Sequence, residues 1–149
     1  MKKQLLQIAA TLSLCLMLGV VAKAQMTRQM TVTVPFAFNV GKTTLPAGTY
    51  TVYGTSTATG DGFLLRDADG QVKAVFNTQQ IQSGAARTVS RLEFRRYNNK
   101  YFLGSVWAAG NNIGRELQQT RLERETARGD ARHLAKKDSK TEVVTITAQ

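Results

Sequence analysis

Carboxylate side chains are the first candidates for chemistry in this sequence. Asp67 and Asp69 precede Gly70 in a D-x-D-G run, which is the opening pattern of a calcium-binding loop. Such a loop also needs an acidic residue at its twelfth position, and that position holds Thr78. An Asp-Gly pair is equally typical of a tight turn between two strands, so the sequence favours a turn at residues 67–70.

Catalysis would have to rest on carboxylates alone. His133 is the only histidine, which excludes a catalytic triad of the Ser-His-Asp kind and a multi-histidine metal site. Hydrolysis by two acidic groups is the remaining chemistry, and its candidates are Asp61, Asp67, Asp69 and Glu93. Three of these four lie in predicted turns, where Asp is common for backbone reasons. We therefore predict no enzyme, no catalytic or metal-binding residue and no cofactor.

Basic side chains form the most extensive pattern. The chain has 20 Lys and Arg residues against 10 Asp and Glu, and after Thr120 the arginines recur every three or four residues, as on one side of a helix. The candidate polyanion-binding residues are Arg91, Arg95, Arg96, Arg121, Arg124, Arg128 and Arg132. Glutamates interleaved with them favour a second interpretation, a solvated network of ion pairs.

Aromatic residues support an alternative function, a small barrel that binds an apolar ligand. The residues that would line the cavity of that barrel, or fill an ordinary core in its place, are Phe36, Phe38, Phe94, Tyr101 and Trp107. With so few aromatic residues, core filling is the default expectation.

The first 24 residues predict export. Two lysines follow Met1, an apolar run extends over residues 5–21, and Ala22-Lys23-Ala24 has the form of a cleavage site. The alternative is a retained membrane anchor, but the apolar run is short for the roughly 20 residues that a span needs. We expect cleavage before Gln25 and a periplasmic or extracellular location.

Cleavage would change both cysteine content and charge. Cys15 is the only cysteine, so the mature chain would have no disulfide, no thiolate and no transmembrane segment. Three of the 20 basic residues precede the cut, which leaves a mature net charge of +7. The expected partners are envelope polyanions, namely acidic polysaccharide, lipopolysaccharide or anionic lipid, attracted by a salt-sensitive Coulomb force. No specific nucleic acid is expected.

Period-two alternation predicts strands in the first part of the mature chain. Residues 31–40 alternate valine and phenylalanine with smaller or polar residues, and Pro35 implies a sheet edge, a bulge or a bend. Further strands are predicted at residues 49–53, 62–66 and 71–77, followed by a polar loop at residues 78–88.

Residues 90–108 predict a hairpin that turns at Asn98-Asn99, because Asn tolerates the left-handed backbone of a type I′ turn. This turn would pair Phe94 with Leu103 and Leu92 with Ser105. One face would then gather Leu92, Phe94, Tyr101, Leu103 and Trp107. The opposite face would be mixed, with Arg91, Glu93 and Arg95 beside Phe102, Gly104 and Val106.

The strand period is lost after Asn112. Thr120 and Glu123 have the spacing of a capping box, in which the Glu123 carboxylate reaches back to the start of a helix that continues to about Lys137. Residues 143–147 are strand-like, so this tail either joins a sheet edge or is disordered.

Several motifs together resemble a known group of proteins. They are VPFAFNVG at 34–41, LPAGTY at 45–50, RY at 96–97, YFL at 101–103, VW at 106–107 and GREL at 114–117. Over roughly residues 31–128 the chain resembles an uncharacterised family of small, exported, β-rich bacterial proteins with signal peptides. The resemblance implies an exported β module with a charged helical end and brings no assigned activity.

The predicted fold is mainly β, an antiparallel sandwich or short barrel of about six to eight strands with a C-terminal charged helix. The predicted segments are a signal peptide at 1–24, a β domain at 25–113, a charged helical segment at 114–140 and a tail at 141–149. The predicted function is non-catalytic, a binding or structural module at the cell envelope or outside the cell. A further alternative is assembly by strand exchange, with residues 26–34 or the tail 143–147 adding to the sheet edge of a neighbouring subunit.

Overall fold

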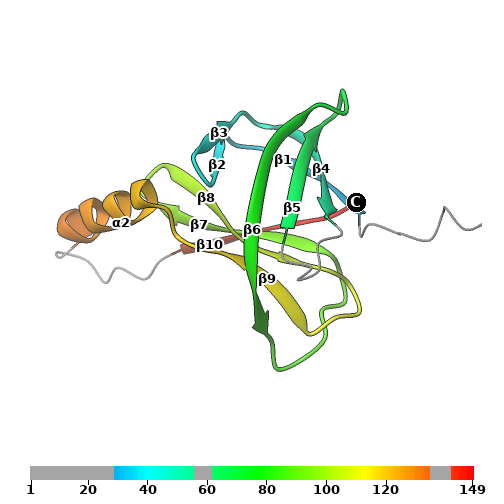
Figure 1. Ribbon diagram of the computed structural model, residues 1–149. Coiled ribbons are helices and arrows are strands. Elements are labelled where there is room, and N and C mark those ends of the chain that lie inside the picture. Colours follow the sequence, from blue (N-terminus) through cyan, green and yellow to red (C-terminus); the bar gives the residue numbers. More distant parts are fainter. Residues whose placement is uncertain (1–28, 56–61, 135–141) are drawn as a thin grey trace, which may run out of the picture.

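The computed structural model describes residues 29–55, 62–134 and 142–149 (Figure 1), and for residue 29 and residues 132–134 it describes the backbone alone. The predicted signal peptide and its cleavage site lie outside these residues. The elements are β1 (Gln29–Val34), β2 (Phe38–Val40), β3 (Thr43–Leu45), β4 (Gly48–Gly54), β5 (Gly62–Asp67), β6 (Val72–Gln82), β7 (Arg91–Tyr97), β8 (Lys100–Trp107), β9 (Ile113–Leu117), α2 (Arg121–Leu134) and β10 (Glu142–Thr147). The mainly β fold with a C-terminal charged helix is confirmed, with ten strands in the described residues where about six to eight were predicted.

The long strand β6 connects two layers of one mixed, unclosed sheet. Its first half pairs with β5, in the order β1-β4-β5-β6, and its second half pairs with β9. Beyond β9 lies β8, which pairs with β7 along one edge and runs parallel to β2 on the other. Figure 1 shows β6 passing from the first layer to the second.

The main core lies between these layers and is built by alternation along the strands. Val32, Tyr50 and Leu65 point inward from β1, β4 and β5, while Leu92 and Phe94 point inward from β7. All five side chains are buried, as a period-two pattern with one apolar face requires.

Pro35 separates β1 from β2, which confirms the predicted bend. Proline has no N–H for a sheet ladder, so pairing stops there. The chain then leaves the β4 side of the fold and enters the second layer, where β2 pairs with β8.

Both predicted tight turns are present, and one of them differs from the predicted type. Gly70 has a φ of 78°, and its N–H donates to the carbonyl of Asp67 over 3.0 Å. Asn98 has a φ of 54°, and Tyr97 pairs with Lys100 across the hairpin as expected. Asn99 does not have a positive φ, so the turn is not the predicted type I′, which needs a positive φ at both central residues.

The predicted hairpin register is wrong beyond Phe94. Phe94 pairs with Leu103 as expected, but Glu93 pairs with Ser105 and Leu92 with Val106, so Gly104 is an extra, bulged residue. A Cβ at Gly104 would lie 3.2 Å from the Glu93 carbonyl oxygen, which favours glycine in the bulge. Because a one-residue slip reverses the faces, Val106 points into the main core.

Trp107 moves to the opposite face for the same reason and is absent from the main core cluster, contrary to the predicted face. Its ring covers Gly114 of β9, where an added Cβ would lie 2.6 Å from the ring atom Cε3. The close approach of β9 to Trp107 therefore requires glycine at position 114.

Two strand assignments in the polar regions are also corrected. β6 continues through residues 78–82, which were predicted as loop, and residues 113–117 form β9 inside the predicted helical segment. These two stretches pair with each other, Thr78 with Leu117 and Gln82 with Ile113. Tertiary pairing overrides the weak strand propensity of their Gln, Arg and Glu residues.

The start of α2 is confirmed and its capping box is half correct. The Glu123 N–H donates to Thr120 Oγ1 over 3.1 Å, as a capping residue requires. The Glu123 carboxylate, however, binds Arg95 of β7 instead of reaching back. α2 is described as far as Leu134, and its predicted end near Lys137 lies outside the described residues. No helix among the described residues is long and apolar enough to cross a membrane.

The tail forms a strand, β10, along the free edge of β7, from Glu142 opposite Arg96 to Thr147 opposite Arg91. At its end, the Gln149 N–H donates to the Thr31 carbonyl of β1 over 3.1 Å. β1 itself pairs with β4, so both candidate exchange strands pair within their own chain here.

Candidate functional site

Arg95 and Glu123 form the central contact of a polar layer on the face of β7 away from the main core. Arg95 Nε donates to Glu123 Oε1 over 2.6 Å, and another guanidinium nitrogen donates to Glu123 Oε2 over 3.3 Å. The Glu123 side chain is 3% exposed and that of Arg95 is 14% exposed. Arg95 also donates to the Leu117 carbonyl and to Glu116. This pair joins α2 to the sheet.

Tyr97 extends the same layer. Its hydroxyl donates to Glu123 Oε1 over 3.4 Å and accepts from Gln119 Nε2 over 3.2 Å. Its ring meets Phe102 edge to face, at a centroid distance of 5.9 Å. Burial, together with the negative charge of Glu123, raises the pKa of the Tyr97 phenol.

This raised pKa predicts a loss of stability in alkali. The folded protein holds the Tyr97 proton to higher pH than the unfolded chain, whose phenol has a pKa of about 10. The stability that protonated Tyr97 contributes to the folded state is therefore complete below a pH of about 10 and is lost as the pH rises through the pKa of Tyr97 in the folded protein. We expect the urea midpoint to fall less steeply above that pH in Tyr97→Phe. Parallel curves for the two proteins would contradict this assignment.

A second chain of hydrogen bonds runs from Arg91 to Trp107. Arg91 donates to Glu93 Oε1 over 2.6 Å, Ser105 Oγ donates to Glu93 Oε2 over 2.8 Å, and Trp107 Nε1 donates to Ser105 Oγ over 2.9 Å. The Arg87 guanidinium lies 4.6 Å from the centre of the Trp107 ring. Glu93, a candidate acid in the sequence, is thus held in a structural network.

The seven candidate arginines divide into two groups. Arg91 and Arg95 belong to the polar layer, and Arg96 pairs with Glu142 over 3.0 Å while lying above the Tyr101 ring. The other group lies on α2 and consists of Arg121, Arg124, Arg128 and Arg132. The first three are exposed, and the Arg132 side chain lies outside the description.

Arg121 and Arg124 have different partners. Arg121 makes a surface ion pair with Glu125 over 2.8 Å and remains 88% exposed. Arg124 donates from one guanidinium nitrogen to the Gln119 carbonyl over 2.9 Å, and this is the single hydrogen bond of its side chain within the described part of the chain. Several of the arginines form ion pairs with glutamates, as the interpretation as a solvated ion-pair network expects. The exposed ion pairs are surface pairs, which contribute little to stability.

Four of the five candidate aromatic residues pack on one another. Phe36 stacks on Tyr101 at 3.9 Å between centroids, and Phe94 meets Phe36 and Phe38 edge to face at 5.3 Å each. Phe38 and Phe94 are fully buried. Trp107 lies on the other face. These contacts support core filling at the four aromatic positions.

Two of the candidate acids, Asp67 and Glu93, each have a basic partner of their own. Asp67 pairs with Lys73 over 2.8 Å, and the hydrogen bond from Lys73 lowers the pKa of the Asp67 carboxyl. Asp61 lies outside the described residues. Within the described ranges, no group of three or more His, Cys, Asp or Glu side chains could hold a metal ion.

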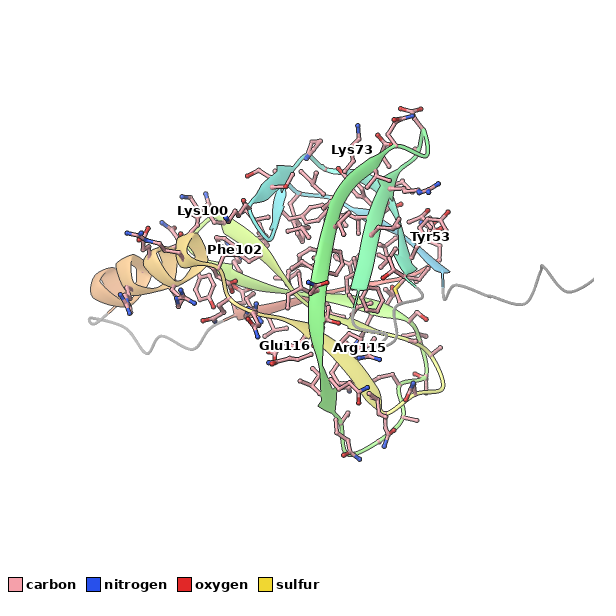
Figure 2. All side chains as sticks on the ribbon, viewed as in Figure 1. Tyr53, Lys73, Lys100, Phe102, Arg115 and Glu116 are labelled. Carbon is pink, nitrogen blue, oxygen red and sulfur yellow. The ribbon has the colours of Figure 1, made fainter. Side chains whose placement is uncertain are left out.

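A polar cleft of about 400 Å³ lies beside the start of α2, and we call it the α2 cleft. It is lined by Gln79, Arg95, Glu116, Leu117, Gln118, Gln119 and Arg124. Figure 2 shows Glu116 on β9, which the register places opposite Gln79 of β6. Of these residues, only Arg95 and Arg124 are candidate binding residues in the sequence. The available signal was the glutamines at 79–80 and 118–119, which the sequence pattern assigns to a loop and to a helical segment.

A second cleft, of about 600 Å³, lies where the tail approaches β1, and its lining includes Thr31, Ser90 and Gln149.

Comparison of the chain with protein-family models, with curated proteins and with solved structures found no match. Any functional assignment therefore depends on the residues themselves.

Proposed function

We propose that this chain is an exported, non-catalytic module that binds envelope polyanions through the exposed arginines of α2. One observation supports this above the others. The helix extends away from the sheet at one end of the molecule (Figure 1), with Glu123 as its buried anchor, while Arg121, Arg124 and Arg128 remain in solvent. A projecting cationic helix is accessible to a large polymer, and guanidinium groups bind carboxylate, sulfate and phosphate.

Location and charge support the same proposal. The predicted signal peptide would deliver the chain to a compartment rich in anionic polymers, and its mature net charge of +7 would attract them. The test of export is the mass of the protein recovered from a bacterial host that expresses it with its leader. A mass that begins at Gln25 supports export, and an uncut chain contradicts it.

Binding is tested with polygalacturonate at low ionic strength. In the triple variant Arg121→Gln/Arg124→Gln/Arg128→Gln we expect affinity to fall on the order of 100-fold, because each basic residue near an anionic surface contributes about 1 kcal/mol. The remaining binding should also be less sensitive to salt.

The matched control removes the same charge elsewhere, with Lys42→Gln/Arg66→Gln/Lys73→Gln, and we expect it to retain most of the affinity. Equal losses in the two triple variants would assign binding to net charge alone and overturn the role of α2. Absence of binding by the unaltered protein would overturn the proposal as a whole.

A further inference from the structure

We propose that the α2 cleft recognises a uronic-acid unit, so that the preferred polyanion is an acidic polysaccharide. This inference rests on the proposed function, because the same helix supplies one wall of the cleft. Its volume of about 400 Å³ lies in the range of sites that bind small molecules.

Two side chains of the cleft, Arg95 and Glu116, are held in place by contacts within the protein. Arg95 is fixed by Glu123 and by the Leu117 carbonyl, as described above. Glu116 accepts from Arg95 through Oε1 and from Gln79 Nε2 through Oε2, each over 3.4 Å. Side chains held in one geometry lose little conformational entropy on binding, which favours recognition of a ligand of defined shape.

The charges of the cleft fit one anionic group. The carboxylates of Glu116 and Glu123 both contact Arg95, and their two negative charges exceed its one positive charge, so Arg95 is not available to an anionic ligand. Arg124 has no carboxylate partner among the described residues, and its one hydrogen bond to Gln119 leaves further guanidinium N–H donors for a ligand. Guanidinium binds carboxylate in a bidentate manner.

The other groups of the cleft fit hydroxyls. The Gln79 and Gln118 amides both donate and accept, and both residues are exposed. The Glu116 side chain is 36% exposed and only accepts, so it suits a sugar hydroxyl and repels a second phosphate or sulfate. A carboxylate flanked by hydroxyls is the chemistry of a uronic acid. Arg121 and Arg128 would contact neighbouring units of the polymer.

The experiment compares polygalacturonate with dextran sulfate and with vesicles of anionic phospholipid, at one ionic strength, by calorimetry. The test variant is Gln79→Ala/Gln118→Ala, and the control is Gln80→Ala, because Gln80 follows Gln79 on β6 and points to the opposite face. We expect about a tenfold loss of polygalacturonate affinity in the double variant, since each substitution removes one side-chain hydrogen bond to the sugar. The double variant should keep its affinity for dextran sulfate, and the Gln80→Ala control should keep its affinity for polygalacturonate.

The outcomes separate the two proposals. Equal affinity of the unaltered protein for all three probes, or an unchanged polygalacturonate affinity in the double variant, would overturn recognition by the cleft. The polygalacturonate affinity of the α2 triple variant would then still test whether the exposed arginines of α2 bind polyanions. Preference for the lipid vesicles would overturn the polysaccharide assignment and point to a membrane surface.

Discussion

Glu123→Ala is expected to lower the free energy of unfolding by about 3 kcal/mol, because the buried Arg95 guanidinium loses its closest carboxylate and keeps only the longer contact with the half-exposed Glu116. The Arg95 side chain is only 14% exposed, so water cannot replace the lost partner fully. The same substitution removes the acceptor of the Tyr97 hydroxyl. Urea unfolding followed by far-UV circular dichroism measures the change.

Two further variants test this explanation. Glu125→Ala removes the exposed partner of Arg121 and should cost about 0.3 to 0.5 kcal/mol. The apolar double replacement Arg95→Met/Glu123→Leu should recover most of the lost stability, because no charge remains buried. If Glu123→Ala and Glu125→Ala cost the same, the buried pair does not anchor α2.

Phe94→Ala is expected to cost about 3 to 5 kcal/mol, the range for removing a large aromatic side chain from a core. Phe94 is fully buried and contacts the rings of both Phe36 and Phe38, so its loss opens a cavity that neighbouring strands cannot close. The measurement is again the urea midpoint. Val75→Ala, at a side chain that is 71% exposed, should stay within about 0.5 kcal/mol. A similar small loss in Phe94→Ala would mean that the aromatic cluster is loosely packed.

Local signals in the sequence predicted the local structure well. Gly70 and Asn98 are residues that tolerate a positive φ, and Thr120 has a hydroxyl for the first turn of a helix, so each position carries its own physical reason. Pro35 likewise has no N–H to donate to a sheet ladder, which is why a bend was among the outcomes predicted for it. Alternation over residues 31–40 also placed Val32 and Val34 of β1 on the buried face.

Features that depend on pairing between distant segments were not predictable in this way. The bulge at Gly104 shifts the strand register by one residue, and the residues beside Gly104 do not predict this shift. β9 and the second half of β6 are strands because they pair with each other, although neither has strong strand propensity.

The candidate site was predictable in part. The arginine spacing of α2 follows from helix geometry, and the helix is present where it was expected. Arg95, in contrast, was grouped with the exposed arginines by its type alone. Only the fold places it against Glu123, 28 residues further along the chain. The cleft glutamines come together for the same reason, from β6 and from the segment before α2.

Trp107 offers an optical probe of the layer outside the main core. It is the only tryptophan of the chain, and its buried ring lies between Arg87 and Gly114, away from the phenylalanines around Phe94. Its fluorescence therefore reports whether β9 stays paired with β8, while circular dichroism reports the whole sheet. An emission shift at lower urea concentration than the loss of ellipticity would show that β9 separates from β8 first, as a separate step of unfolding.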